Sequence, residues 1–385
     1  MVIYPSDWFA NKLEEICVPS GLVRGPFGGS LKKSIFVRKG NKVYEQRNAI
    51  YKSFRIGDYF IDDDKYTELS RFAVEENDFI ISCSGTIGKI YKIPTEAPKG
   101  VINQALLKIR LDKNKCDLDY FYIYFQWDKF QSKITDDTQG GAMKNLVGMS
   151  VFRNTLIYMP PDIAEQQAIA SALSSFDEHI DNLAELIEKK RAIRNGALED
   201  LVSGKTRIDG FDDEWEKGVI GDILTILHGR NQFSVESFSG KYPILGTGGV
   251  IGKAAEYLCD WECVLIGRKG TIDNPLYMDT PFWTIDTLYY SRPMQNQSVK
   301  FQYYLFCTIC WADYAESSGR PSLAKKVIEE IPIRIPSEPE QKAIAQILTE
   351  MDDEIESLET ERAKMMQVRD GAMDDLLTGR MRLKV

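Results

Sequence analysis

Two groups of residues resemble catalytic or cofactor-binding motifs, but neither group meets all the requirements of the motif that it resembles. Pro161-Asp162 and Glu188-Lys189-Lys190 match the order of the PD…ExK nuclease pattern, whose carboxylates must meet at one Mg²⁺ ion. The helix predicted below would hold Asp162 and Glu188 roughly 39 Å apart at ~1.5 Å per residue. These carboxylates therefore do not predict a nuclease.

The second group resembles cofactor-binding sequences. The segment from Gly246 to Ala254, GTGGVIGKA, has five residues between Gly246 and Gly252 and alanine after Lys253, so it departs from the GxxxxGK[ST] phosphate loop. Asp273-Asn274-Pro275-Leu276-Tyr277 lacks the second proline of the Asn-Pro-Pro-Tyr signature of amino-methyltransferases. No glycine-rich cofactor loop accompanies it, and we interpret it as a turn.

Metal binding and histidine chemistry are also disfavoured. Cys259, Cys263, Cys307 and Cys310 have a spacing that a Cys₄ zinc site could use. The last two lie in the apolar run YYLFCTICW, which favours buried free thiols. The aromatic residues there are predicted to be core: Phe301, Tyr303, Tyr304, Phe306 and Trp311. With only two histidines, His179 and His228, a triad is also disfavoured. We predict no catalytic residue and no metal.

Residues that suit nucleic acid are present instead. A glycine-rich loop at 25–30, predicted to be flexible, is followed closely by lysines and arginines, which suits tracking of phosphates. Arginine and asparagine in the second half are types that read base edges. The candidate DNA-binding residues are Lys32, Lys33, Arg38, Lys39, Lys42, Lys144, Asn145, Arg230, Asn231, Arg268, Lys269 and Arg320. A solvated basic surface would have the same composition, so that alternative stays open.

Charge and composition limit the class of protein. The 385 residues carry a net charge of −9, which is unlike an independent nucleic-acid binder. The charge is uneven: residues 1–163 sum to +3, whereas residues 209–338 sum to −6. No run of 18 apolar residues and no signal sequence is present, which predicts a cytoplasmic protein with reduced cysteines and no membrane contact.

An internal repeat indicates how the chain is organised. The 44 residues from Glu165 match those from Glu340 at a constant offset of 175, with 17 identities. Apolar residues recur in both copies at alternating steps of four and three, which predicts two long helices that bury a shared seam. Each would be ~38 residues, or ~57 Å at ~1.5 Å per residue. Gly204 and Gly379 stand where a left-handed cap would end each helix, and we expect Gly196 and Gly371 to serve close helix packing.

The blocks before each helix are also alike. Phe79–Ile93 and Cys263–Met278 each contain an apolar run followed by Gly-Thr-Ile, and each block continues with an aromatic helical stretch. The predicted domains are residues 1–162, a helix at 163–208, residues 209–338 and a helix at 339–385. The fold class is α+β, with two globular domains joined by two antiparallel coiled-coil helices in a pseudo-twofold repeat.

Taken together, these features resemble the specificity subunit of type I restriction–modification systems. The resemblance covers nearly the whole chain and depends on the repeat, the EQ-x-AIA starts at Glu165 and Glu340, the D-x-x-I-x-x-L seams, and the G-A-x-x-D-L endings from Gly196 and Gly371. It implies a non-catalytic protein whose two target recognition domains each read half of a bipartite DNA site. Alternatives are a scaffold or anti-restriction decoy that binds modification subunits without productive DNA recognition, and a single-chain nuclease or methyltransferase.

The resemblance also implies partners. Two modification subunits would bring S-adenosylmethionine, and restriction or translocase subunits would bring ATP and Mg²⁺, separate or fused; this chain would hold no cofactor. The helices would fix the gap between half-sites, under about 10 base pairs given ~3.4 Å per pair, and dock the modification subunits. The spacer and partner-binding candidates are Glu165, Gln166, Ile169, Leu173, Ile180, Leu183, Glu340, Gln341, Ile344, Leu348, Ile355 and Leu358. We expect the more basic first domain to supply more of the non-specific DNA affinity.

Overall fold

Two compact units make up the chain in a computed structural model. Residues 4–136, 145–316, 319 and 321–383 are described. Unit 1 consists of residues 1–182 and 362–385, and unit 2 of residues 183–361. Each unit contains one sheet-rich domain and part of both long helices. None of the described helices is both long and apolar enough to cross a membrane.

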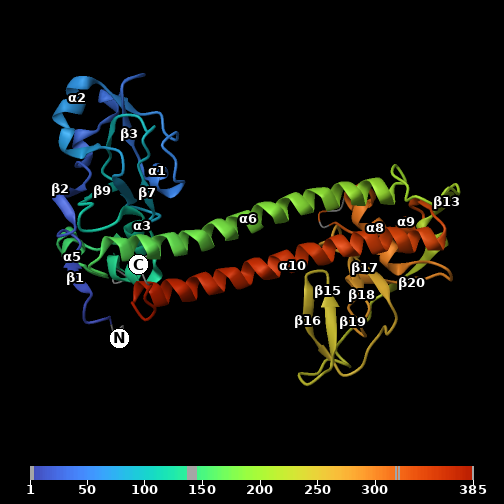
Figure 1. The fold of residues 1–385 in the computed structure, drawn as a ribbon. Coiled ribbons are helices and arrows are strands. Elements are labelled where there is room, and N and C mark those ends of the chain that lie inside the picture. The colour runs from blue at the N-terminus through green and yellow to red at the C-terminus, as the bar shows by residue number, and fades with distance from the viewer. Residues whose placement is uncertain (1–3, 137–144, 317–318, 320, 384–385) are drawn as a thin grey trace. The chain divides into compact units, whose positions relative to one another are not determined.

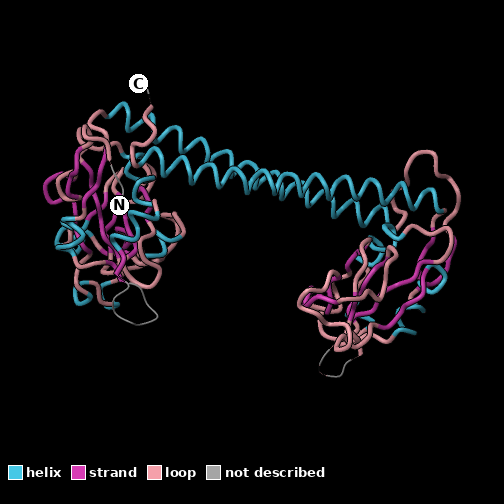
Figure 2. Tube along the Cα trace, turned by 90° about the horizontal axis from the view of Figure 1, so that it is seen from below, coloured by secondary structure: helices cyan, strands magenta, loops and turns pink. Residues whose placement is uncertain are grey.

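The two long helices are α6 (Ile163–Val202) and α10 (Glu338–Leu377), each of 40 residues (Figure 1). Inside unit 1 the start of α6 and the end of α10 contribute to one core, through Leu173 and Leu376 for example. Inside unit 2 the end of α6 and the start of α10 do the same, through Leu198 and Leu348. The helices therefore pack antiparallel, as both views show (Figure 2).

Glycines within and after these helices differ in their surroundings. Gly204 and Gly379 have φ of +72° and +71°, which confirms the predicted left-handed caps. Gly196 and Gly371 are exposed, and a Cβ added to either would meet nothing within 4 Å. The expected packing role is therefore wrong: both are surface positions at which the helix continues unbroken.

The sheet-rich domain of unit 1 has two four-stranded sheets, in the orders β2-β9-β6-β7 and β4-β3-β8-β5, and two-stranded pairs β1-β12 and β10-β11. The strands are β1 (Phe9–Lys12), β2 (Cys17–Arg24), β3 (Asn41–Tyr44), β4 (Phe60–Ile61), β5 (Ala73–Val74), β6 (Phe79–Ser82), β7 (Ile90–Lys92), β8 (Gly100–Ile102), β9 (Leu106–Leu111), β10 (Thr135–Asp136), β11 (Asn145–Leu146) and β12 (Leu156–Met159). The short helices are α1 (Gln46–Ile50), α2 (Asp63–Glu68), α3 (Leu118–Gln126), α4 (Asp128–Ile134) and α5 (Met149–Asn154), with 3-10 turns at Gly28–Ser30, Lys33–Ile35 and Ser70–Phe72.

The domain of unit 2 has sheets in the orders β14-β20-β17-β18 and β16-β15-β19, and the pair β13-β21. Its strands are β13 (Glu216–Val219), β14 (Leu224–His228), β15 (Tyr242–Gly246), β16 (Gly249–Ala254), β17 (Cys263–Gly267), β18 (Leu276–Met278), β19 (Trp283–Thr284), β20 (Leu288–Pro293) and β21 (Pro332–Ile335). Its helices are α7 (Ile220–Ile223), α8 (Val299–Thr308) and α9 (Lys325–Glu329), with a 3-10 turn at Trp311–Tyr314.

The two domains share a topology that sequence identity does not reveal. In each, a four-stranded antiparallel sheet adjoins a second sheet that contains one parallel pair, β3 with β8 and β15 with β19. The Gly-Thr-Ile turns follow equivalent strands, β6 and β17. The pseudo-twofold repeat therefore includes the domains as well as the helices.

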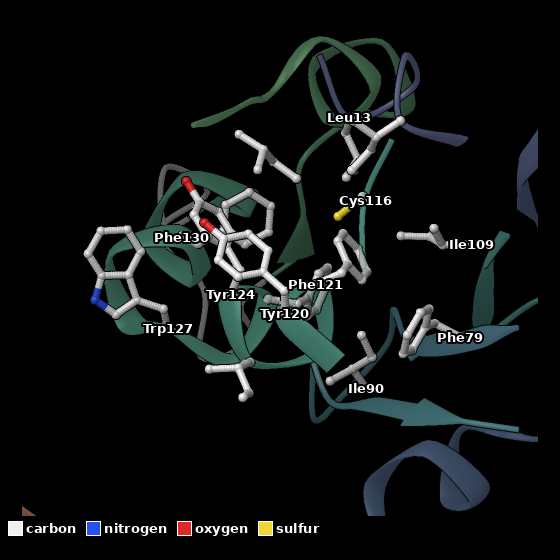
Figure 3. Packing of buried hydrophobic residues seen from close by; sticks show 14 of the residues in the cluster. Leu13, Phe79, Ile90, Ile109, Cys116, Tyr120, Phe121, Tyr124, Trp127 and Phe130 are labelled. Carbon is white, nitrogen blue, oxygen red and sulfur yellow. The ribbon is translucent and has the colours of Figure 1, made fainter. Parts of the chain in front are cut away.

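The aromatic stretches fill the cores, as predicted. In unit 1, Tyr120, Phe121 and Tyr124 of α3 are almost fully buried and pack with Phe130 of α4 and Phe79 of β6 (Figure 3). In unit 2, Phe301, Tyr304, Phe306 and Trp311 are 2% exposed or less, whereas Tyr303 is half-buried and packs against the edge of the core. The near-complete burial of the other rings removes them from any base-stacking role.

Candidate nucleic-acid interface

The candidate residues of unit 2 meet at one edge of its four-stranded sheet. Strand β20 lies between β14 and β17, with His228 opposite Tyr289 and Gly267 opposite Leu288. The last residues of β14 and β17 therefore lie beside the first residues of β20. Arg230 follows β14 and its N–H donates to Thr284 O at 2.8 Å, while Arg268 follows β17 and its N–H donates to Thr287 O at 2.8 Å.

A further loop joins this edge. Gly270 N–H donates to Pro321 O at 3.0 Å, and Leu323 N–H donates to Arg268 O at 2.9 Å. Arg268 and Lys269 thus lie next to the segment that contains Arg320, although Arg320 itself lies outside the described residues. Asn231 Oδ1 accepts from Phe233 N–H at 2.8 Å, so this side chain shapes the loop after β14. The structure therefore brings Arg230, Asn231, Arg268 and Lys269 to one edge.

Unit 1 has the same edge. Gly25, after β2, donates its N–H to Leu106 O at 2.9 Å, and Cys83, after β6, donates to Ala105 O at 2.8 Å. The loops after β2 and β6 therefore flank the segment before β9, as the loops after β14 and β17 flank the segment before β20. The two domains therefore place their candidate loops at equivalent sheet edges.

Several residues at this edge of unit 1 escaped the sequence analysis. A surface cleft of about 560 Å³ is lined by Arg24, Phe27, Arg71, Gln104 and Arg153, among others. Arg24 ends β2, Gln104 precedes β9, and Arg153 Nη2 donates to Leu22 O at 3.3 Å. Scattered along the chain, these residues form no basic run. Arg71 lies in the 3-10 turn at Ser70–Phe72 and Arg153 in α5, so no single local signal in the sequence marks the set.

The predicted basic run lies after the loop at 25–30 and not at the sheet edge itself. Lys32, Lys33, Arg38 and Lys39 are exposed between the 3-10 turn at Gly28–Ser30 and β3. Their exposure leaves them able to meet phosphates, and that role stays a prediction. Lys144 lies outside the described residues, as does the side chain of Asn145.

Lys42 corrects the sequence analysis. It lies in β3 and is 3% exposed, and its Nζ donates to Gly57 O at 2.8 Å. Burial lowers the pKa of this ammonium group. A lysine held inside the domain in this way supports the fold and does not reach DNA, so it leaves the set of candidate contacts.

One glycine in each domain holds the loop at this edge. A Cβ on Gly25 would lie 1.8 Å from Asn103 O, and one on Gly229 would lie 1.9 Å from Ile285 O. Real Cβ atoms do not approach that closely, so only glycine lets the chain cross the neighbouring segment here. Gly25 and Gly229 therefore cannot carry a side chain without displacing the neighbouring segment, and the flexibility expected for the loop at 25–30 stays a prediction.

The polar residues predicted to bind partners are used inside the chain. Arg382 donates through Nη2 to Glu165 Oε2 at 2.7 Å, and Arg207 donates through Nε to Glu340 Oε1 at 2.7 Å. Gln166 Oε1 accepts from Asp117 N–H at 2.8 Å, and Gln341 Oε1 accepts from Ser298 N–H at 2.9 Å. All four acceptors, Glu165, Gln166, Glu340 and Gln341, are 4% exposed or less. They dock each domain on its helix and are not free to contact another subunit, which corrects the prediction.

The apolar seam residues lie where the heptads predicted. Ile169, Leu173, Leu183, Ile344 and Leu348 are 6% exposed or less, whereas Ile180, Ile355 and Leu358 are half-buried.

In each unit an ion pair at the same position of the repeat flanks the seam. Arg369 donates to Asp177 and Arg194 donates to Asp352, with Nε–Oδ1 distances of 3.0 and 2.7 Å. The two pairs occupy the same positions of the repeat, so each unit clamps the helices in the same way.

The cysteines form no zinc site. Cys259 Sγ lies 3.8 Å from Cys263 Sγ, and both residues are buried. Cys310 is exposed. Within the described part of the chain, no group of three or more His, Cys, Asp or Glu side chains could hold a metal ion.

Comparison with known proteins identifies the family. The family model of the type I restriction modification DNA specificity domain matches residues 5–190 and, a second time, residues 212–365. The chain belongs to this family. Its two copies each include one sheet-rich domain and most of one long helix, in agreement with the internal repeat.

Curated and solved relatives agree with this membership in the DNA specificity family. The chain is 23% identical over 356 residues to the MjaVIII specificity subunit of Methanocaldococcus jannaschii, covering 81% of this chain and 80% of that one. A crystal structure of the S subunit of a type I system from M. genitalium matches with a TM-score of 0.59, 21% identity and 96% of each chain. A structure from a study of complex assembly of the type I system matches with a TM-score of 0.64 at 14% identity, covering 98% of this chain and 99% of that one. At these identities the solved structures show the fold alone.

Proposed function

We propose that the chain is the DNA-recognition subunit of a type I restriction–modification complex, and that each sheet-rich domain reads one half of a bipartite target. The observation that carries this function is the equivalent sheet edge in the two domains. Both edges present loops with arginine and amide side chains on a backbone fixed by a close-packed glycine. Phosphate contacts from arginine position a protein on DNA, and amide and guanidinium groups read base edges.

The catalytic chemistry belongs to other subunits in this proposal. Modification subunits hold S-adenosylmethionine and methylate adenine, and restriction or translocase subunits use ATP and Mg²⁺. The chain itself acts in the cytoplasm as a non-catalytic adaptor. The exposed surfaces of α6 and α10 are where modification subunits dock, since the repeated polar residues at the start of both helices are buried and bonded within the chain.

The direct test is to co-express the chain with the products of neighbouring genes and map adenine methylation across the genome. We expect methylation at one bipartite motif with a fixed gap. A stable complex that methylates nothing, or methylation at an undivided motif, would contradict the proposal.

The length of the helices leads to a prediction about the gap. Inserting two heptads in both α6 and α10, at facing positions, adds about 21 Å at ~1.5 Å per residue. We expect the gap between half-sites to grow by about six base pairs at ~3.4 Å each, with both half-sites unchanged. The same methylation map measures it. An unchanged gap would show that the helices do not set the spacing.

The arginines of the unit 1 cleft lead to a prediction about salt. Arg24→Ala and Arg71→Ala each remove a cation at the sheet edge, so each should reduce the slope of log affinity against log salt by about 1. Lys113→Ala is the matched control, because Lys113 is exposed just beyond the opposite end of β9. Equal salt slopes for all three variants would show that the DNA phosphates do not contact Arg24 or Arg71. Binding of the complete complex is measured between low and moderate salt.

A further inference from the structure

An exposed phenylalanine follows the close-packed glycine in each domain. Phe27 is 93% exposed two residues after Gly25, and Phe233 is 79% exposed four residues after Gly229. Transfer of a phenyl ring into water is unfavourable, and large aromatic side chains are normally covered. Both rings are uncovered at equivalent loops of the duplicated fold, where a ligand bound at the sheet edge would bury them.

Both rings are carried by hydrogen-bonded turns. Ser30 N–H donates to Phe27 O at 2.9 Å, which closes the 3-10 turn next to Phe27. In unit 2, Phe233 N–H donates to Asn231 Oδ1 at 2.8 Å, and Glu236 N–H donates to Gln232 O at 2.8 Å. The backbone beneath each ring is thus set before any ligand arrives, so little ordering cost falls on binding.

The charges around the rings favour a polyanion as that ligand. Phe27 lines the same cleft as Arg24, Arg71 and Arg153. Phe233 lies three residues after Arg230, at the edge that also holds Arg268. A protein partner could cover an apolar ring, but the surrounding arginines match the phosphates on either side of a base step.

We propose that Phe27 and Phe233 are wedges, each inserting its ring between two base pairs of its own half-site. This inference rests on the proposed function and adds to it a local unstacking of DNA by the specificity chain itself. Apolar wedges of this kind unstack a step at an energetic cost that depends on the bases. The two phenylalanines would therefore contribute to specificity by selecting a step that opens easily.

The test uses the complete complex and duplexes that carry its methylation-mapped site. The fluorescent analogue 2-aminopurine replaces bases one at a time through each half-site. With the unmodified complex, we expect a rise in fluorescence at the step that Phe27 opens and at the step that Phe233 opens. Phe27→Ala should abolish the first rise and Phe233→Ala the second, and each should weaken binding about 10-fold or more. Phe→Leu variants should retain part of both effects.

The control is Phe238→Ala. Phe238 is fully exposed in the same unit as Phe233. It follows Ser237, whose N–H donates to Lys253 O at 2.9 Å near the last residue of β16. It should change neither signal. When 2-aminopurine replaces the target adenine, its fluorescence reports the action of the methyltransferase subunit, and this signal should persist in every variant.

Two results would overturn the wedge. The first is that Phe27→Ala and Phe233→Ala leave the fluorescence profiles unchanged. The second is that these variants lose the modification subunits, which would show that the rings contact a protein. Failure of the unmodified complex to bind the bipartite site would instead count against the proposed function.

Discussion

Replacing Gly229 with alanine is expected to abolish reading of the half-site that unit 2 recognises, and to leave the other half-site unaffected. The new Cβ would lie 1.9 Å from Ile285 O and 2.7 Å from Thr284 O, both backbone atoms. Neither oxygen can move without shifting the segment between β19 and β20. The loop that carries Arg230 and Asn231 must therefore be displaced.

The expected size of this effect follows from the packing. Forcing extra atoms into a packed site costs about 1–3 kcal/mol, and about 1.4 kcal/mol changes an affinity tenfold. We therefore expect the complex to lose about 10- to 100-fold in affinity for its bipartite site. The measurement is binding to three duplexes: the intact site, and the same site with either half scrambled.

The scrambled duplexes make the prediction specific. If Gly229→Ala removes one half-site reading, scrambling that half should cost the variant nothing more, while scrambling the other half should cost it as much as it costs the unmodified complex. Gly248→Ala is the control, since a Cβ there meets nothing within 4 Å. A loss that falls equally on both half-sites would contradict the assignment of one edge to one half-site.

Sequence patterns were sufficient for elements whose signal is repeated along the chain. The heptads of α6 and α10 and the caps at Gly204 and Gly379 were predicted because each occurs twice at one offset, with the spacing that helix geometry requires. The core aromatics followed from apolar periodicity. The Gly-Thr-Ile turns identified equivalent strands for the same reason.

Residues whose role depends on a distant partner were not predicted. Glu165 and Glu340 were predicted to bind partner subunits, since nothing local in the sequence shows that Arg382 and Arg207 bind them within the chain. Lys42 was predicted to contact DNA because it is close in sequence to other basic residues. Its ammonium group is instead bound by Gly57 O, which is distant in the sequence. In each case the deciding contact joins segments that only the fold brings together.

The sheet edge was missed for a related reason. Arg24, Arg71 and Arg153 line one cleft although they are far apart in the sequence, whereas the sequence analysis favoured lysines and arginines that are adjacent in the chain. Strand order decides which loops meet, and strand order is not encoded in local composition.

Glu340→Ala is expected to be the most destabilising single change at the join between unit 2's domain and α10. The carboxylate is 1% exposed and accepts from Arg207 Nε at 2.7 Å, Arg207 Nη2 at 2.9 Å and Trp215 Nε1 at 2.9 Å. Removal takes the acceptor from the Trp215 indole N–H and the carboxylate from the Arg207 guanidinium, whose Nη2 keeps its bond to Asp213 O at 3.0 Å. Removing one partner of a buried ion pair lowers the free energy of unfolding by about 3–5 kcal/mol. Because Arg207 is partly exposed, we expect a loss at the lower end, about 3 kcal/mol.

The same first turn of α10 provides the control. Glu338 carries the same charge but pairs with Lys342 at 2.7 Å on the surface, where an ion pair contributes about 0.2–1 kcal/mol. Hydrogen exchange of the purified chain locates the effect. Glu340→Ala should speed exchange at 213–219 and in the first turns of α10, while Glu338→Ala should not.

The repeat supplies a second copy of this experiment. Glu165 is bound by Arg382 in unit 1 as Glu340 is bound by Arg207 in unit 2, so Glu165→Ala should speed exchange in the first turns of α6 and leave the start of α10 protected. Equal effects of Glu340→Ala and Glu338→Ala would show that Arg207 finds compensation in water. In that case Gln341, whose Oε1 accepts from Ser298 N–H at 2.9 Å, would be left to hold the domain on its helix.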